Sequence, residues 1–299
     1  MYWNSLNDRL REQYGTKVYK LALSSGCSCP NRDGTLGTRG CIFCDGAGAF
    51  AAAGDIQAQL MEAKARVAAK VGAEAKYIAY FQSFTNTYGP VERLRALYTA
   101  AIEPEEIVAL SIATRPDCLG IEVLELLSEL NARKPVWVEL GLQTIHPETA
   151  KYIRRGYELP VYEEAVAHLR ERGISVITHQ ILGLPGENAD MMAETAQYIG
   201  QSGANGVKFH LLHVLEGTDL ATDWKAGKFQ TMTIDAYIEV LEECVRRIPR
   251  EMVIHRLTGD GAKRDLLAPL WSGDKKRVLN AIHKAFLRDD VEQGSALWQ

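Results

Sequence analysis

Long hydrophobic runs are missing from this 299-residue sequence. A membrane-spanning helix needs about 20 consecutive apolar residues, so we expect no membrane partner. The first residues also lack the charged and then apolar layout of an export signal, which predicts a cytoplasmic protein. The formal net charge is −4, because acidic residues outnumber Lys and Arg, so the composition as a whole does not indicate a nucleic-acid-binding protein.

Cysteine is scarce as well, with 6 residues in the chain, but four of them fall between positions 27 and 44. In a cytoplasmic chain we expect metal ligands or buried thiols rather than disulfides. Cys27, Cys29, Cys41 and Cys44 would together complete a tetrahedral zinc site, although a Cys-x-Cys pair chelates a single ion poorly. Three of them would instead hold a [4Fe–4S] cluster with one iron open to a small molecule. The spacing favours the cluster and leaves zinc as the alternative.

Segments rich in β-branched and aromatic residues alternate with helical segments along the chain. The expected strands are 18–23, 76–82, 107–112, 136–140, 175–182 and 206–212, and the expected helices are 55–71, 90–102, 121–131, 161–171, 189–201 and 234–247. Such tandem repeats predict a parallel sheet, because parallel neighbours need a crossover connection that is usually helical. We therefore predict an α/β fold, a partial (β/α)6 TIM-like barrel of parallel strands, with a doubly wound open sheet as the alternative.

Two parts of the chain are expected. Residues 1–250 form the barrel, with a cysteine loop at 26–49. Residues 251–299 form a C-terminal extension, which starts with a short strand at 252–256 and continues as mainly helical, basic sequence. Residues 246–288 contain eleven Lys and Arg residues against four acidic ones. This asymmetry permits contact with an anionic partner such as RNA, and a solvated helical face is the alternative.

Polar residues recur where the predicted strands end, and in a parallel barrel these ends share one mouth. They include Gln82, Ser83, Thr85 and Asn86 after the second strand, Thr114 and Arg115 after the third, Glu139 and Gln143 in the fourth, His179 in the fifth, and Lys208, His210 and His213 in or after the sixth. Glu139 lies in an apolar strand and needs a buried partner, for which Arg115 is a candidate. His213, three positions after His210, is expected to face the opposite side, which argues against a two-histidine metal site.

Short motifs follow one another in a fixed order along most of the chain. They are CPNRDG at 29–34, GCxxC at 40–44, YFQxxTNTY at 80–88, ATRPD at 113–117, VELGLQ at 138–143, RRG at 154–156, HQILGLPG at 179–186 and LEGTD at 215–219. Together they resemble the radical SAM superfamily, and more narrowly its YtqA/YhcC subgroup. That subgroup is similar to the radical SAM domain of elongator-type tRNA-modifying proteins. The eleven residues between Cys29 and Cys41 match this subgroup rather than the shorter spacing of most of the superfamily.

The resemblance implies a [4Fe–4S] cluster held by Cys29, Cys41 and Cys44, with Cys27 a bystander. It implies cleavage of S-adenosyl-L-methionine (SAM) to a 5′-deoxyadenosyl radical. The implied SAM contacts are Gln82, Ser83, Thr85, Asn86, Thr114, Arg115, Glu139, Gln143, Arg155, His179, Gly183 and Leu184. The candidate substrate contacts are Lys208, His210 and His213, together with Lys275, Lys276 and Arg277 in the basic extension.

The implied substrate is tRNA. The resemblance places the reaction in wobble-uridine (xnm5s2U) modification, where a carboxymethylaminomethyl side chain is converted toward aminomethyl. The implied partners are an electron donor of the flavodoxin or ferredoxin type and a downstream methyltransferase. Two alternatives stay open, namely a radical SAM enzyme acting on a small molecule or peptide and a zinc-stabilised barrel that binds RNA without catalysis.

Overall fold

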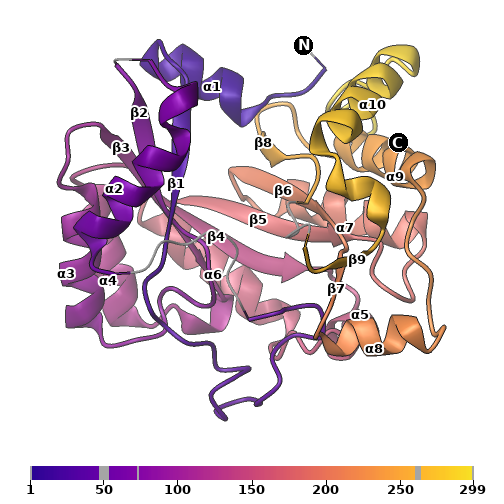
Figure 1. The fold of residues 1–299 in the computed structure, drawn as a ribbon, viewed down its shortest axis with the longest axis horizontal. Helices are drawn as coiled ribbons and strands as arrows, with labels where there is room; N and C mark the ends of the chain where they lie inside the picture. Colours follow the sequence, from indigo (N-terminus) through magenta and orange to yellow (C-terminus); the bar gives the residue numbers. More distant parts are fainter. Residues whose placement is uncertain (1, 47–53, 73, 260–263, 298–299) are drawn as a thin grey trace.

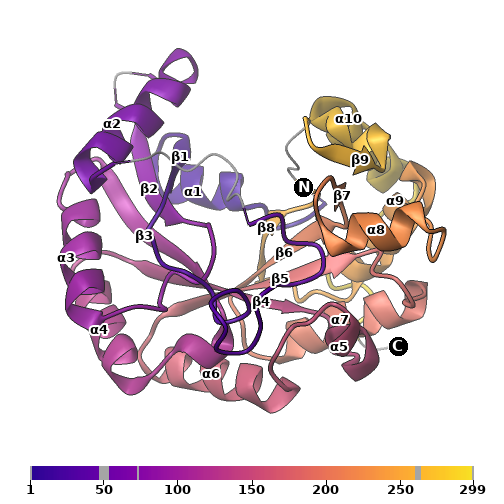
Figure 2. The same ribbon diagram turned by 60° about the horizontal axis from the view of Figure 1, so that its bottom comes forward.

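A computed structural model describes residues 2–46, 54–72, 74–259 and 264–297. Seven parallel strands form one sheet in the order β1-β2-β3-β4-β5-β6-β8. These strands are β1 (Val18–Leu23), β2 (Lys76–Phe81), β3 (Ile107–Thr114), β4 (Val136–Gln143), β5 (Ser175–Leu182), β6 (Gly206–Leu211) and β8 (Val253–Arg256). The sheet curls into a half-barrel with helices along its outside (Figures 1 and 2). The predicted α/β fold of parallel strands is confirmed.

The outer helices connect consecutive strands. They are α2 (Ile56–Val67), α3 (Val91–Ile102), α4 (Ile121–Asn131), α6 (Leu159–Glu171), α7 (Ala189–Gln201) and α9 (Ile234–Arg246). Several start at a polar cap, since the side chains of Asp55, Asn188 and Thr233 each accept a hydrogen bond from a backbone N–H in the first turn. None of the helices in the described parts of the chain is long and apolar enough to cross a bilayer.

The two faces of the sheet differ in chemistry. On β4, Val138 and Leu140 belong to the main core under the helices, and each is fully buried. Burying such a side chain stabilises the fold by roughly 1.5–3 kcal/mol. Trp137 and Glu139 alternate with them and face the barrel interior, because successive side chains of a strand point to opposite sides. The interior is therefore where buried polar groups gather.

The C-terminal extension starts inside the sheet. The short strand expected at 252–256 is β8, which pairs with β6 and becomes the seventh strand. Near the N-terminus, Ser5 forms a bridge with Ile254 next to α1 (Leu6–Tyr14). The remaining elements are α5 (Pro147–Tyr152), β7 (Val214–Leu215), α8 (Asp219–Lys225), β9 (Leu266–Ala268) and α10 (Lys275–Arg288), as well as short 3-10 turns. The division at residue 250 remains a prediction.

Candidate functional site

The cysteine loop leaves β1 and crosses the mouth of the half-barrel (Figure 2); its residues 47–49 lie outside the described chain. Cys29, Cys41 and Cys44 line a cavity of about 260 Å³, here called the cysteine cavity. The Cys44 amide donates to the Cys41 carbonyl at 3.0 Å, which closes a tight turn between the two side chains. The loop therefore brings three thiol groups to one space.

Arg32 holds the cysteine loop from inside. Its Nη2 donates to the Cys44 carbonyl at 2.5 Å. Gly40 and Gly46 both have positive φ, and a Cβ built on Gly40 would lie 2.8 Å from the guanidinium. Only glycine meets both conditions at low cost. The glycines beside the cysteines thus make room for the arginine that fixes the loop.

The donor set fits an iron–sulfur centre. Burial raises the pKa of the Cys41 thiol to about 11, although Asn31 Nδ2 donates to its sulfur at 3.4 Å. A thiolate there needs a compensating positive charge, which a metal centre supplies. Among the residues that the structure describes, no group of three or more His, Cys, Asp and Glu side chains is close enough to hold a single metal ion.

Cys27 takes no part in the cysteine cavity. Its side chain is buried in the main core, and its sulfur lies 4.0 Å from the Asn86 carbonyl. A Cβ on Gly89 would approach the same sulfur at 3.3 Å. The structure therefore places Cys27 with the packed interior, where a bystander is expected.

A single buried carboxylate, Glu139, is the centre of the barrel interior. Its Oε1 accepts from Lys20 Nζ at 2.8 Å and from Ser111 Oγ at 2.7 Å. Its Oε2 accepts from His179 Nε2 at 2.8 Å and also from Lys208 Nζ. Burial opposes ionisation, but the lysines and His179 hold the pKa of Glu139 well below its usual value. Both oxygens are thus occupied by protein donors.

The alternative in which Arg115 forms a structural ion pair with Glu139 was wrong. Arg115 pairs with Asp117 instead, with Nε–Oδ1 at 2.9 Å and Nη2–Oδ2 at 2.8 Å. Asp117 lies only two residues away, so a local bidentate pair forms without crossing the barrel. Glu139 is neutralised by lysines of β1 and β6, and pairing across the barrel is visible only in the folded sheet.

Arg155 is the buried guanidinium that reaches the cysteine cavity without a carboxylate partner among the described residues. Its Nη1 donates to the Thr144 carbonyl at 2.7 Å, and its Nε donates to the Tyr157 carbonyl at 3.0 Å. The guanidinium lies 4.6 Å from the centre of the Tyr157 ring, and that of Arg115 lies 5.4 Å from it. Desolvation lowers the pKa of Arg155. Such a site favours an anionic ligand.

A bulge at the end of β4 aims Gln143 into the cavity. The pairing of β4 with β5 shifts register between Gly141 and Gln143. Gln143 has φ 68°, and a Cβ on Gly141 would lie 2.8 Å from Gln143 Nε2. Phe84 on the facing loop has φ 63° and also lines the cavity. Strained residues of this kind cluster at functional sites.

Most of the predicted SAM contacts line the cysteine cavity: Gln82, Thr85, Thr114, Arg115, Glu139, Gln143, Arg155 and His179. Ser83 lies outside this set, and Asn86 is fully buried, where its amide donates to the Phe81 and Ala113 carbonyls. Leu184 packs in the apolar cluster that includes Ile42 of the cysteine loop.

The loop from Gly183 lines a different cavity, of about 540 Å³, in which Phe229 and Met232 also take part. The structure therefore does not bring Gly183 and Leu184 to the cysteine cavity. Their roles as SAM contacts stay predictions, as do those of the residues that line it.

A second cavity of about 340 Å³ adjoins the cysteine cavity, and we call it the histidine chamber because His179, His210 and His213 line it. Gln82 and Gln143 line both spaces. The expectation that His210 and His213 face opposite sides was wrong. Strand β6 ends at Leu211, so the alternation of a strand no longer applies to His213.

Sequence reasoning missed several residues at the site. Tyr157 lines the cysteine cavity, and Tyr80 and Arg256 line the histidine chamber. Arg256 ends β8, so the rule that polar residues follow barrel strands would have found it, had the strand been counted with the barrel. Tyr157 directly follows the RRG motif but carries no signal of its own.

The basic residues Lys275, Lys276 and Arg277 are exposed in the first turn of α10. They do not line either cavity. Trp271, just before the helix, donates from Nε1 to the Met232 carbonyl at 3.0 Å, near the start of α9. Helix α9 begins on the side where the strands end, so the basic turn lies on the mouth side of the molecule, outside the barrel.

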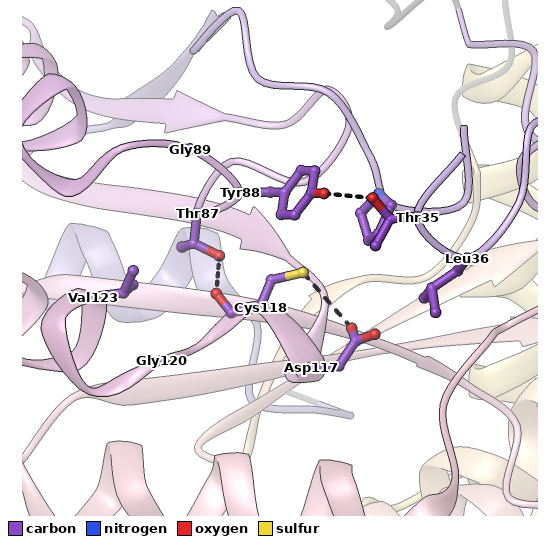
Figure 3. A pocket seen from close by; sticks show the side chains of 10 residues that line it. Thr35, Leu36, Thr87, Tyr88, Gly89, Asp117, Cys118, Gly120 and Val123 are labelled. Carbon is purple, nitrogen blue, oxygen red and sulfur yellow. Dashed lines mark hydrogen bonds between the residues drawn. The ribbon is translucent and has the colours of Figure 1, made fainter. Parts of the chain in front are cut away.

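An additional pocket of about 560 Å³ lies beside the cysteine loop (Figure 3). The hydroxyl groups of Thr35 and Tyr88, which both line this pocket, form a hydrogen bond of 2.9 Å. Thr87 Oγ1 donates to the Cys118 carbonyl at 2.6 Å. None of the predicted cluster ligands or SAM contacts lines this pocket.

Comparisons with known proteins give the family models and relatives that this chain matches. Residues 34–199 match the model of the Radical SAM superfamily, and residues 204–288 match the Radical_SAM C-terminal domain. The chain is 45% identical to the protein YtqA of Bacillus subtilis, over 98% of this chain and 92% of YtqA. It is 38% identical to the protein YhcC of Escherichia coli, over 98% of this chain and 95% of YhcC.

More distant similarity involves proteins that are longer than this chain. A tRNA uridine(34) acetyltransferase of Methanocaldococcus jannaschii is 30% identical over 51% of this chain and 28% of its own length. The structure of Elp3 from Methanocaldococcus infernus superposes with a TM-score of 0.72 at 19% identity, over 92% of this chain. This chain spans 64% of that Elp3 chain, and the likeness establishes the shared fold.

Proposed function

This chain belongs to the radical SAM superfamily, and from that membership we propose that Cys29, Cys41 and Cys44 hold a [4Fe–4S] cluster beside a SAM site in the cysteine cavity. When bound, the cluster supplies the electron that cleaves SAM to methionine and a 5′-deoxyadenosyl radical. The observation that carries the proposal is that three thiol groups and the buried guanidinium of Arg155 line the same cavity.

Different side chains would bind different polar groups of SAM. Arg155 would bind its carboxylate through Nη2, because Nε and Nη1 already donate to the Tyr157 and Thr144 carbonyls. Gln82 and Thr85, on the loop after β2, line the same cavity and would accept hydrogen bonds from the amino group. Gln143 and His179 are left for the remaining polar groups of the cofactor. Glu139 acts as a positioning residue, since its two oxygens already accept from His179 and the lysines.

We propose tRNA as the substrate, with the wobble uridine as the modified base. The support is the similarity to tRNA uridine(34) acetyltransferases and the exposed basic turn of α10 on the mouth side. In this reaction a hydrogen atom would be taken from the carboxymethyl carbon next to the nitrogen. Loss of one further electron, to the oxidised cluster, would give an imine, and its hydrolysis would release the two carboxymethyl carbons as glyoxylate and leave the amine. The base leaves its stack and enters the histidine chamber, because chemistry on a base requires it to be extruded.

Two protein partners follow from this proposal. The cluster needs an electron donor of the flavodoxin or ferredoxin type, because the chain itself brings no reductant. A methyltransferase would act downstream, because the aminomethyl product carries a primary amine that such an enzyme can methylate.

The decisive experiment compares wobble nucleosides in cells with and without the gene. Loss of the protein should leave carboxymethylaminomethyl nucleosides accumulated and aminomethyl-derived nucleosides depleted. Unchanged nucleosides would exclude the tRNA substrate and favour the second candidate, a small molecule or peptide. The net charge of −4 supports that second candidate, because a negatively charged protein does not attract RNA as a whole.

Iron and sulfide analysis of anaerobically purified protein tests the cluster itself. We expect a brown protein with roughly four irons per chain. A colourless, zinc-loaded protein would instead support the zinc-stabilised RNA-binding barrel.

A further inference from the structure

Asn31, in the CPNRDG motif of the cysteine loop, links this loop to the segment that carries Arg155. Its side chain is buried, and its Nδ2 donates to the Arg154 carbonyl at 2.7 Å. The same nitrogen donates to the sulfur of Cys41 at 3.4 Å. One side-chain amide therefore contacts both a proposed cluster ligand and the chain next to the proposed SAM carboxylate site.

The orientation of this amide follows from its acceptors. A backbone carbonyl only accepts hydrogen bonds, so the nitrogen of the amide, and not its oxygen, must face the Arg154 carbonyl. The nitrogen carries two protons. The Arg155 carbonyl is 3.5 Å away and already accepts from Arg115 Nη1 at 2.7 Å. The second proton is thus left for the Cys41 sulfur.

Neighbouring glycines hold Asn31 in this position from two sides. The Asn31 carbonyl accepts from the Gly40 amide at 2.7 Å, directly before Cys41 in the chain. On the other side, Gly156 has φ 81°, and a Cβ built on it would lie 2.8 Å from Asn31 Oδ1. A larger residue at position 156 would therefore displace the amide. A side chain that is locked in this way keeps its donor aimed at one atom.

The role of this hydrogen bond changes when Cys41 binds iron. As a thiol, the Cys41 sulfur lies 3.6 Å from the Arg154 carbonyl and can donate its proton there. A sulfur that holds iron is a thiolate and has no proton to donate. It then acts as an acceptor, and the Asn31 N–H is a donor that already points to it.

Hydrogen bonds to the sulfurs of an iron–sulfur cluster help to set its reduction potential. Reduction adds negative charge to the sulfurs, and an N–H donor stabilises the more negative state, because hydrogen bonds to charged acceptors are the stronger ones. A donor at a ligand sulfur therefore makes a cluster easier to reduce.

We propose that Asn31 is a positioning residue that raises the reduction potential of the cluster through its hydrogen bond to Cys41. The inference rests on the proposed function, in which Cys41 is a cluster ligand, and it adds a residue that controls electron uptake. Because the same amide binds the Arg154 carbonyl, Asn31 also ties the ligand to the chain directly before Arg155.

A redox titration of anaerobically purified protein, followed by electron paramagnetic resonance, measures this effect. Asn31→Leu has a similar size but no N–H donor. At a given potential it should shift the ratio of reduced to oxidised cluster about 10-fold toward the oxidised form, which is about 59 mV for one electron. Asn31→Asp has the same shape but offers acceptor oxygens, and it should shift the ratio in the same direction. Thr38→Val, exposed in the same loop, is the control and should leave the potential unchanged.

An isotope label tests the same hydrogen bond without a substitution. In wild-type protein with 15N in its asparagine side-chain amides, the reduced cluster should show a hyperfine coupling to 15N. Such a coupling requires a labelled amide in contact with a cluster sulfur, and a purely structural role of Asn31 elsewhere in the loop would not produce it.

Iron content and melting temperature show whether each variant is folded and loaded. The inference is overturned if the loaded Asn31→Leu and Asn31→Asp variants keep the wild-type potential, or if the labelled wild type shows no coupling. If neither variant holds iron, the labelled wild type decides by itself. A wild type that binds no cluster would overturn the proposed function, and the inference with it.

Discussion

Cys27 and Cys29 are two positions apart in the sequence but have different surroundings. Cys27 is buried in the main core, whereas Cys29 lines the cysteine cavity. We predict that Cys29→Ala abolishes cluster binding, because each of the three thiolates holds one iron. Cys27→Ala should keep the iron content and lose roughly 1–3 kcal/mol of stability through the small cavity it leaves. Iron analysis and thermal unfolding measure the two effects, and equal iron loss in both variants would contradict this assignment.

Arg155 is the residue on which SAM affinity should depend most. We predict that Arg155→Lys raises the KM for SAM roughly 10-fold or more, because a single ammonium cannot both replace the bonds to the Thr144 and Tyr157 carbonyls and present a further donor to the carboxylate. The iron content should stay unchanged, which separates cofactor binding from cluster loss. Arg133→Lys is the control, since Arg133 pairs with Glu103 at the surface. An unaltered KM would remove Arg155 from the SAM site.

The buried ion pairs of Glu139 should contribute more to the free energy of unfolding than an exposed ion pair does. We predict that Glu139→Gln destabilises the protein by about 3–5 kcal/mol, because Lys20 and Lys208 are left without their shared carboxylate. Denaturant unfolding measures this loss. Glu129→Gln, which breaks an exposed pair with Arg95, should change stability by less than about 1 kcal/mol. Similar losses in both variants would mean that the buried network is not held together by Glu139.

At the scale of elements, the first turn of α10 has an unusual charge. Basic residues are disfavoured at a helix N-terminus, where the helix dipole is already positive. Lys275, Lys276 and Arg277 lie there and are exposed, with Asp274 as the cap. An interaction with phosphate groups is a physical reason to keep them, since helix N-termini bind phosphate.

Charge reversal at this turn tests that reason. We predict that replacing all three residues with Glu weakens tRNA binding and lowers the slope of log K against log salt by about 2–3. The helix itself should be slightly more stable, because acids suit its N-terminus. Reversal of Arg9 and Arg11, exposed on α1, is the control. Unchanged affinity and salt slope would exclude α10 from RNA contact.

At the scale of the whole molecule, the C-terminal extension packs against the barrel through α9 and α10, and this contact is sensitive to pH. Glu242 on α9 faces Asp289 at the end of α10, and burial together with that acid raises the pKa of Glu242 to about 7. A carboxyl group with a raised folded pKa binds its proton more tightly in the folded state. Stability from this group is therefore present at low pH and is lost as the pH rises toward 7.

We predict that Glu242→Gln raises the melting temperature at pH 8 by about 2–4 °C and has little effect near pH 4.5. The difference between the variant and the wild type should develop across the interval between these values. Glu239→Gln, on the exposed side of the same helix, should show no such difference. A gain that is independent of pH would contradict the titration of Glu242.

The strands, the helices and the cysteine loop were predictable because they are local. Period-two and helical patterns place residues on one face of an element, and the strand ends of a parallel barrel must meet at one mouth. Gln82, Thr114 and Gln143 were therefore expected near one another, and they line one cavity. The order of the short motifs also predicted the radical SAM superfamily, and the comparisons confirm that prediction.

The sequence by itself determined the alternation of strands and helices, the cysteine spacing and the family. Only the tertiary structure decided that Glu139 pairs with Lys20 and Lys208 rather than Arg115, and that His213 and Arg256 line the same chamber as His210. These outcomes depend on strand register and strand ends across the curled sheet. The curl of the sheet brings together side chains such as Lys20 and Glu139, which are 119 positions apart, and no local pattern specifies such a contact.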